Sequence, residues 1–411
     1  INILYYSAQR GYDEAIKMVI PEDVASSCKE VNFVNDSDET PLLMASRNGY
    51  ATVVEYLVKC GAKINIGDYL DETPLHGASS KGHEKVVEYL VKCEAKINCS
   101  DINCETPLFA ASSNGHEKVV EYLAECKADV NHANEYGKIP LHGASSKGHE
   151  KTVECLVKHR ANIDHTDDNG CTPLFTASSN GHDNIVQFLV KSGAGIDLAD
   201  KYGLTPLFVA SSQGHEKIVD CLVKCKADID HVDNDGWTPL YVACYNGHKK
   251  TVQCLVIHKA QIDFVDKYDR SPLYAAVSNG HEEVVQYLVE CGVRIHRVDK
   301  CGEPPLYAAS SKSQEGIVQY LRKCDAEINR LDENGCTPLY QASENGCEEI
   351  VQDLVKCGAN INFVNTSGKT PLYVASGNGH EEIVKYLMKC GADINHDVYG
   401  KTPLYVASAN G

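Results

Sequence analysis

The stretch Asp200-Lys201-Tyr202-Gly203-Leu204-Thr205-Pro206-Leu207 decides the fold, because variants of it recur along the whole chain. Its proline belongs to a series at positions 41, 74, 107, 140, 173, 206, 239, 272, 305, 338 and 371, with 33 residues from each member to the next. A twelfth member, Pro403, comes one residue early. A period of 33 residues is typical of a solenoid whose units are a turn followed by two short helices.

Each repeat has the pattern of a helical hairpin. Pro suits the first position of a helix, and the Thr before it can cap that helix through its hydroxyl. An Ala follows five residues after the Thr in all twelve repeats, where a larger side chain would push neighbouring helices apart. A Gly then ends the first helix, and the second helix has apolar residues at helical spacing, as over residues 86–91. The remaining Asp-, Asn- and Gly-rich stretch predicts an extended loop with a tight turn.

Three motifs recur in these repeats: Asp-x-x-Gly-x-Thr-Pro-Leu at 200–207, Gly-His after the first helix, and Gly-Ala-Asp-x-Asn at 391–395. The pattern resembles the ankyrin-repeat family over essentially the whole chain. The resemblance implies an all-α ankyrin-repeat solenoid of stacked helix-turn-helix units with β-hairpin-like loops. The family's His after Thr-Pro-Leu is present only as His76 and His142, whereas nine repeats carry Tyr or Phe and one carries Leu43. We therefore expect most repeats to lack the local hydrogen bond that this His makes.

The ends of the chain differ from its middle. We expect residues 1–35 to form a degenerate N-terminal capping repeat, in which an insertion over residues 21–27 covers the end of the core. Residues 36–401 hold eleven ankyrin repeats, and residues 402–411 are a truncated final repeat. Because a single repeat cannot bury its own apolar face, we expect further chain to follow this last one.

Composition excludes several classes of protein. The formal net charge of −18, with no basic stripe, argues against nucleic acid as a partner. The chain has no apolar run long enough to cross a bilayer, so we expect no direct membrane insertion. Nineteen cysteines are too dilute for a disulfide scaffold and odd in number, which favours a reducing, cytoplasmic location. No sequence feature sets an oligomeric state.

Histidine and cysteine recur at fixed phases of the repeat, and we interpret both series as structural. The histidines are placed to begin the second helix and bond the adjoining turn, rather than to form a metal site or proton relay. The cysteines stand near the end of the second helix, where neighbouring helices are about 8–10 Å apart and a disulfide ladder cannot form. The two series are His83, His116, His149, His182, His215, His248, His281 and His380, and Cys60, Cys93, Cys126, Cys225, Cys291, Cys324, Cys357 and Cys390.

One group of residues has zinc-ligand spacing. Cys221 and Cys225 lie four apart on one helix, and Cys254 and His258 repeat that spacing one unit later. Zinc ligands converge to about 2.0–2.3 Å from the ion, whereas these two pairs begin one repeat apart. We therefore predict no metal site and keep a Cys₃His zinc site as the alternative. No phosphate loop, nucleophile elbow or metalloprotease motif occurs, so we expect no catalytic residues, no cofactor and no enzyme activity.

The resemblance implies that a protein or peptide partner is held by the loop tips and outer positions of the first helices, along a concave groove. These positions are mostly neutral and hydrogen-bonding. One place departs from this, because Trp237, the only Trp, precedes a Thr-Pro and Tyr245 ends the first helix of the same repeat. The predicted partner-binding residues are Trp237, Tyr245, Leu204, Arg270, Tyr202 and Tyr268. Such a set has the composition of an interface hot spot, although a single Trp can also stand at a variable tip by drift.

A second irregularity predicts a soft joint over residues 304–330. Pro304 replaces the capping Thr, Ser313-Gln314 replace Gly-His, and Gly316 enters the second helix.

Three function classes fit the sequence. The first is a protein interaction scaffold or adaptor. The others are the cytosolic ankyrin domain of a larger membrane protein such as an ion channel, and a regulatory module tethered to an enzyme.

Overall fold

The computed structural model describes residues 2–20 and 29–410, where helices alternate with turns and loops. The only β pairing among these residues is an isolated bridge between Val398 and Lys401. The expected all-α fold of helix-turn-helix units is thus confirmed. The predicted covering insertion over residues 21–27 lies outside the described residues. The chain divides into two compact units, Ile1–Pro206 and Leu207–Gly411.

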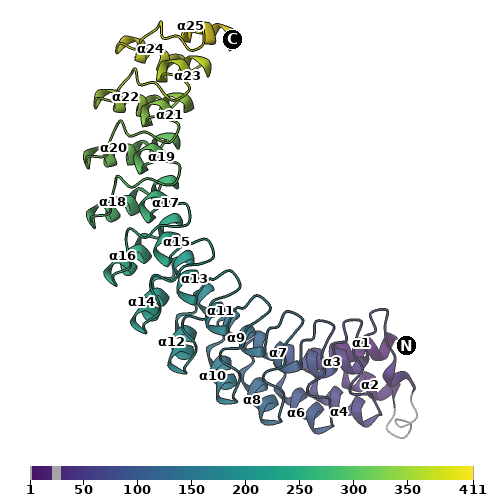
Figure 1. Cartoon of the computed structure of the whole chain (residues 1–411). Coiled ribbons are helices and arrows are strands. Elements are labelled where there is room, and N and C mark those ends of the chain that lie inside the picture. The colour runs from purple at the N-terminus through teal and green to yellow at the C-terminus, as the bar shows by residue number, and fades with distance from the viewer. Residues whose placement is uncertain (1, 21–28, 411) are drawn as a thin grey trace. The chain divides into compact units, whose positions relative to one another are not determined.

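In the first unit, successive helix pairs stack side by side (Figure 1). Its helices are α1 (Asn2–Arg10), α2 (Asp13–Val19), the 3₁₀ helix η2 (Lys29–Asn32), α3 (Pro41–Arg47), α4 (Ala51–Lys59), α5 (Pro74–Ser80), α6 (Glu84–Lys92), α7 (Pro107–Ser113), α8 (Glu117–Glu125), α9 (Pro140–Lys147), α10 (Glu150–Lys158), α11 (Pro173–Ser179) and α12 (Asp183–Lys191).

The second unit repeats this arrangement, beginning within α13 (Pro206–Gln213). It continues with α14 (Glu216–Lys224), α15 (Pro239–Tyr245), α16 (Lys249–Ile257), α17 (Pro272–Ser278), α18 (Glu282–Glu290), α19 (Pro305–Ser311), α20 (Glu315–Lys323), α21 (Pro338–Asn345), α22 (Glu348–Lys356), α23 (Pro371–Gly377), α24 (Glu381–Lys389) and α25 (Pro403–Asn410).

The first helix of each pair begins where the Thr-Pro pattern predicts. In α7, the Thr106 hydroxyl oxygen accepts a hydrogen bond from the backbone N–H of Phe109 at 3.2 Å. In α5, the Nδ1 atom of His76 accepts from the backbone N–H of Thr73 at 3.1 Å, so the family's local bond is present there. Pro304 gives α19 no such side-chain cap. A cap of this kind contributes about 1 kcal/mol, and its loss weakens the start of that helix.

Small and branched apolar side chains form the core of each unit. The recurring Ala of the first helix is fully buried in eleven repeats, from Ala45 to Ala375. Against it lie the Val, Ile and Leu residues of the second helices, such as Val285 and Leu288 in α18, which are also inaccessible to solvent. Within a unit, first helices of successive pairs pack on one another, as α15 does on α17 and α7 on α9. The alanines allow this close approach.

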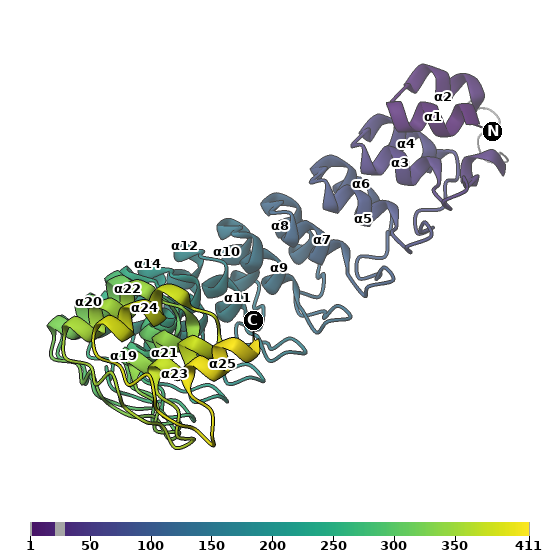
Figure 2. The same cartoon turned by 90° about the horizontal axis from the view of Figure 1, so that it is seen from above.

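Single backbone hydrogen bonds join the loop tips of neighbouring repeats. The N–H of Ile102 donates to the carbonyl of Leu70 at 3.0 Å in the first unit, and the N–H of Lys300 donates to the carbonyl of Tyr268 at 2.9 Å in the second. Figure 2 shows the loops of each unit leaving on the same side as the first helices of its pairs. We call this side of a unit its tip face.

Candidate partner-binding face

A rigid turn positions Trp237 on the tip face of the second unit. One carboxylate oxygen of Asp233 accepts hydrogen bonds from the backbone N–H groups of Asp235 and Trp237, both at 2.8 Å. The N–H of Asp233 donates to the carbonyl of Trp237 at 3.1 Å, and the N–H of Gly236 donates back to Asp233 at 3.0 Å. This closed, hairpin-like turn holds the backbone of Trp237 in place without help from a partner.

The Trp237 ring packs against two tyrosines of helix α15. Its centroid is 4.8 Å from that of Tyr241 and 5.2 Å from that of Tyr245, with the rings tilted by 42° and 38°. Tyr241 and Tyr245 are four residues apart, so both side chains lie on one face of the helix. Tyr241 is buried, Trp237 is half-buried and Tyr245 keeps 40% of its surface exposed. The indole nitrogen of Trp237 is buried without a hydrogen-bond partner among the described residues.

The next tip adds a cation-rich group to this surface. The Arg270 guanidinium lies 4.8 Å from the centre of the Tyr268 ring, and the Lys267 ammonium lies 5.3 Å from it. Arg270 is held by two contacts to the buried carboxylate of Asp266, at 2.8 Å from Nε and 2.6 Å from Nη2. Lys267 pairs with Asp235 of the preceding tip. Two ion-paired cations therefore stand beside the Tyr268 ring.

Sequence reasoning missed Tyr241, which joins these two groups. Burial raises the pKa of its hydroxyl, the positive charge of Arg270 lowers it, and Asp266 raises it. Tyr241 stands in the position after Thr-Pro-Leu, which we considered only for its lost His. Its spacing of four residues from both Trp237 and Tyr245 was the signal that could have found it.

The structure brings four of the six predicted residues together in two contacting pairs, Trp237 with Tyr245 and Tyr268 with Arg270. Tyr202 and Leu204 belong to the first unit. There the exposed Tyr202 ring has the Lys201 ammonium 5.2 Å from its centre, and Leu204 is half-buried. Their membership of the same binding surface stays a prediction.

Comparison with known protein families identifies the family of this chain. A sequence model described as ankyrin repeats (3 copies) matches residues 4–101, 93–167, 141–233, 217–299, 291–365 and 341–411. The chain belongs to the ankyrin-repeat family. A search of curated proteins found no significant match. Ankyrin repeats are generally protein–protein interaction modules, and within the described residues no helix has the length and apolarity to span a membrane.

The histidines of this ankyrin array link neighbouring repeats. In seven of them, Nε2 donates to the backbone carbonyl at the end of the preceding repeat's first helix, at 2.8–3.1 Å: His83 to Arg47, His116 to Ser80, His149 to Ser113, His182 to Ser146, His248 to Ser212, His281 to Tyr245 and His380 to Glu344. We expected this hydrogen bond to go to the adjoining turn. Its acceptor is instead a carbonyl of the preceding repeat. Because the carbonyl only accepts, each ring carries its proton on Nε2.

The position after Thr-Pro-Leu also joins successive ankyrin repeats. Nε2 of His142 donates to the carbonyl of Cys171 in the next repeat at 3.0 Å. Where Tyr replaces His, its hydroxyl takes over the link, as Tyr274 donates to Glu303 at 3.0 Å and Tyr307 to Asp332 at 2.9 Å. The substitution therefore exchanges one cross-repeat hydrogen bond for another.

The cysteines bear on two further predictions, those on disulfides and on a metal site. None of the cysteines in the described part of the array forms a disulfide. Asp220, Cys254 and His258 are the one group of metal-ligating side chains that converges among the described residues. Cys221 and Cys225, the other half of the sequence-based zinc alternative, are not part of this group.

Proposed function

We propose that this array binds a protein partner through the tip face of its second unit, as a scaffold or adaptor. The centre of the contact is the aromatic patch, which we define as Trp237, Tyr241, Tyr245, Tyr268 and Arg270. The observation that carries the proposal is the stack of Trp237 on two tyrosines beside a charged guanidinium. Trp, Tyr and Arg are the residues that most often dominate binding energy at interfaces.

The patch is prepared for binding before a partner arrives. The Asp233 turn fixes the backbone of Trp237, and Tyr241 fixes its ring. Arg270 is likewise held by Asp266. Groups that are already ordered lose little conformational entropy on association, so more of the contact energy becomes affinity.

The chemistry of the patch indicates the kind of partner. Exposed ring surface on Tyr245 and Trp237 suits an aliphatic or aromatic side chain, whereas the positive charges of Arg270 and Lys267 are already balanced by Asp266 and Asp235. The occupant that fits this surface is a peptide segment with an exposed aliphatic or aromatic residue. The net charge of −18 supports a protein rather than a nucleic acid as the partner. Tyr202 and Leu204 of the first unit stay predicted partner contacts of that unit.

Other parts of the array support its proposed setting. Eighteen described cysteines without a disulfide fit a reducing compartment such as the cytosol. We assign the array no catalytic role, because the recurring histidines are engaged in links between repeats.

Trp237 itself supplies the test, because it is the only Trp of the chain. Peptides selected from a displayed random library on the intact array should shift the Trp237 fluorescence to shorter wavelength, since binding removes the half-exposed ring from water. The double variant W237A/Y245A should weaken the same peptides by about 30-fold or more, which corresponds to about 2 kcal/mol.

The matched control is Tyr136→Ala, which removes an exposed tip tyrosine of the first unit. It should leave the affinity unchanged, and circular dichroism should show both variants folded. Peptides that bind W237A/Y245A as tightly as the wild-type array would overturn the assignment of the aromatic patch.

A further inference from the structure

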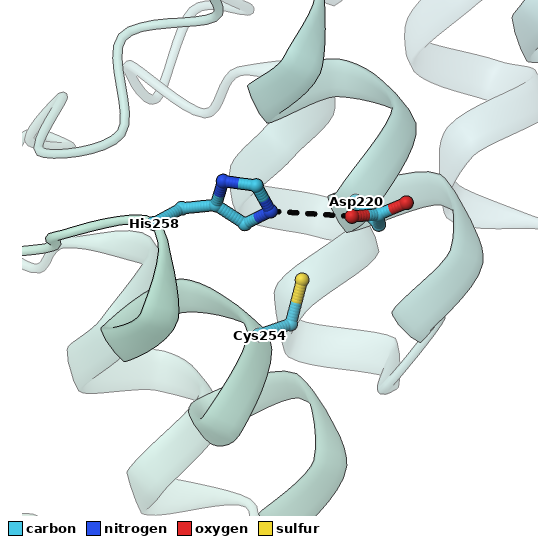
Figure 3. A group of neighbouring side chains, drawn as sticks. All are labelled: Asp220, Cys254 and His258. Carbon is cyan, nitrogen blue, oxygen red and sulfur yellow. Dashed lines mark hydrogen bonds and ion pairs between the residues drawn. The ribbon is translucent and has the colours of Figure 1, made fainter.

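Three potential metal ligands from neighbouring repeats meet on the second-helix side of the second unit. Asp220 lies in α14, Cys254 lies in α16, and His258 caps the end of α16. Their ligand atoms all lie within 4.8 Å of one another, and all three residues are half-buried. Nε2 of His258 is 3.2 Å from Oδ1 of Asp220, as the dashed line in Figure 3 marks.

The geometry points to a Zn²⁺ site formed by these three side chains, with a fourth coordination position left open. Thiolate, imidazole and carboxylate are all zinc ligands, and the first two are ligands that Mg²⁺ and Ca²⁺ avoid. In a tetrahedral site the ligand atoms stand about 3.3–3.6 Å apart, given metal distances of about 2.0–2.3 Å. Oδ1 of Asp220 and Nε2 of His258, at 3.2 Å, are close to that separation, and the Cys254 sulfur lies within 4.8 Å of both.

The sequence explains why potential ligands meet at this place. In repeats such as that of α18, a Tyr and a Cys four residues apart occupy the corresponding positions, and the hydroxyl of Tyr287 bonds the thiol of Cys291. Cys254 and His258 replace that pair. The replacement of Tyr by Cys removes a ring, and the replacement of Cys by His extends an imidazole toward Asp220.

The local charge also favours a cation. The carboxylates of Asp220 and Glu216 act on the Cys254 thiol with their negative charge. The same negative charges attract a divalent ion, which would replace the thiol proton on binding. Lys224 competes, with Nζ 2.6 Å from Oδ2 of Asp220, but this pair is exposed and leaves Oδ1 directed at His258.

The first unit holds a matched set that lacks this convergence. Glu121, Cys155 and His159 stand at the same three repeat positions. There Lys158 takes the carboxylate, with its Nζ 3.2 Å from Oε1 of Glu121, and Nε2 of His159 is buried without a partner among the described residues. The second unit has Ile257 in place of Lys158. The pair Cys155 and His159 therefore serves as an internal control.

The test uses the intact, reduced array, stripped of metal with a chelator and titrated with Co²⁺ and then Zn²⁺. We expect one tight site, a thiolate-to-cobalt charge-transfer band, and a higher thermal midpoint with Zn²⁺, because the ion would join two repeats. Cys254→Ser should abolish the band and the thermal shift. His258→Gln and Asp220→Asn should each weaken Zn²⁺ binding by roughly tenfold or more.

Cys155→Ser and His159→Gln are the controls and should keep the wild-type affinity and spectrum. The proposal is overturned if Cys254→Ser retains the band, if wild-type protein shows none, or if Asp220→Asn binds as wild type. Should Cys254→Ser fail to fold by circular dichroism, His258→Gln decides in its place: an unchanged Zn²⁺ affinity would reject the site.

Discussion

Nε2 of His281 lies 2.8 Å from the backbone carbonyl oxygen of Tyr245, 36 residues earlier in the chain. This hydrogen bond connects the scaffold of one repeat to the aromatic patch of the repeat before it. The imidazole thus helps to hold the end of helix α15, where Tyr245 packs against Trp237. Stacking of repeats and positioning of the proposed binding residues depend here on the same contact.

Replacement of His281 by Ala should therefore have two effects. The loss of one hydrogen bond should lower the free energy of unfolding by about 1 kcal/mol, measured by urea denaturation. Because Tyr245 loses its anchor, the fluorescence of the native Trp237 should also change. His380→Ala removes the equivalent bond to Glu344, far along the chain from Trp237, and should lower stability equally without the spectral change. Identical native spectra for wild type and His281→Ala would contradict the link.

The repeat that begins at Pro304 should exchange its amide hydrogens faster than its neighbours. Gln314 stands where other repeats have His, and its side-chain oxygen is buried without a partner among the described residues. Ser313, at φ +58°, adopts the left-handed conformation that other repeats give to Gly. In the following repeat Cys347 replaces the next His and reaches the carbonyl of Ser310 only at 3.8 Å. The link at Gln314 is thus weakened, and at Cys347 it is replaced by a contact of the thiol with the Ser313 hydroxyl oxygen at 2.7 Å.

Restoring the repeat pattern tests this explanation. The double variant S313G/Q314H should slow exchange over residues 304–330 and raise stability by about 1 kcal/mol, because relief of backbone strain and one new hydrogen bond outweigh the lost contact of Ser313 with Cys347. Hydrogen–deuterium exchange read by mass spectrometry makes the measurement, and the repeat containing α18 is the reference. Exchange over residues 304–330 that is no faster than in this reference would show that no soft joint exists.

The buried His142 should make stability fall in mild acid. Burial lowers its pKa from an ordinary 6.5 to about 4 in the folded array. Between those two values the unfolded chain binds a proton that the folded chain does not, so stability is complete above about pH 6.5 and decreases as the pH falls toward 4. The loss approaches about 3 kcal/mol at the low end of that range.

His142→Phe removes this titration, and Phe occupies the same position in other repeats, for example Phe109. Denaturant midpoints measured from pH 7 to pH 4 should therefore fall less steeply for this variant than for the wild type. Parallel curves for the two proteins would show that His142 is not the group responsible. Tyr is the second choice of replacement, because most repeats of the second unit carry it.

The sequence was sufficient to predict the repeat and its helices, because Thr-Pro, Ala and Gly act locally within each unit. It could not identify contacts that exist only after stacking. The partner of His281 lies in another repeat, and the role of Tyr241 depends on where the Trp237 ring folds back. Asp220 was missed for a similar reason: sequence reasoning compared residues at equal phases, whereas the structure brings Asp220 to His258 from a different phase of the preceding repeat.

The backbone bonds between loop tips have a consequence for how such a chain acquires new partners. The hydrogen bond between the tips at Tyr268 and Lys300 joins main-chain atoms, as does the hydrogen bond between Leu70 and Ile102. Side chains at the tips consequently vary without breaking the ladder that aligns them. Mutation can thus change the side chains of the recognition surface one tip at a time while the array still folds. The tip positions are therefore suitable for randomisation in a library of designed binders.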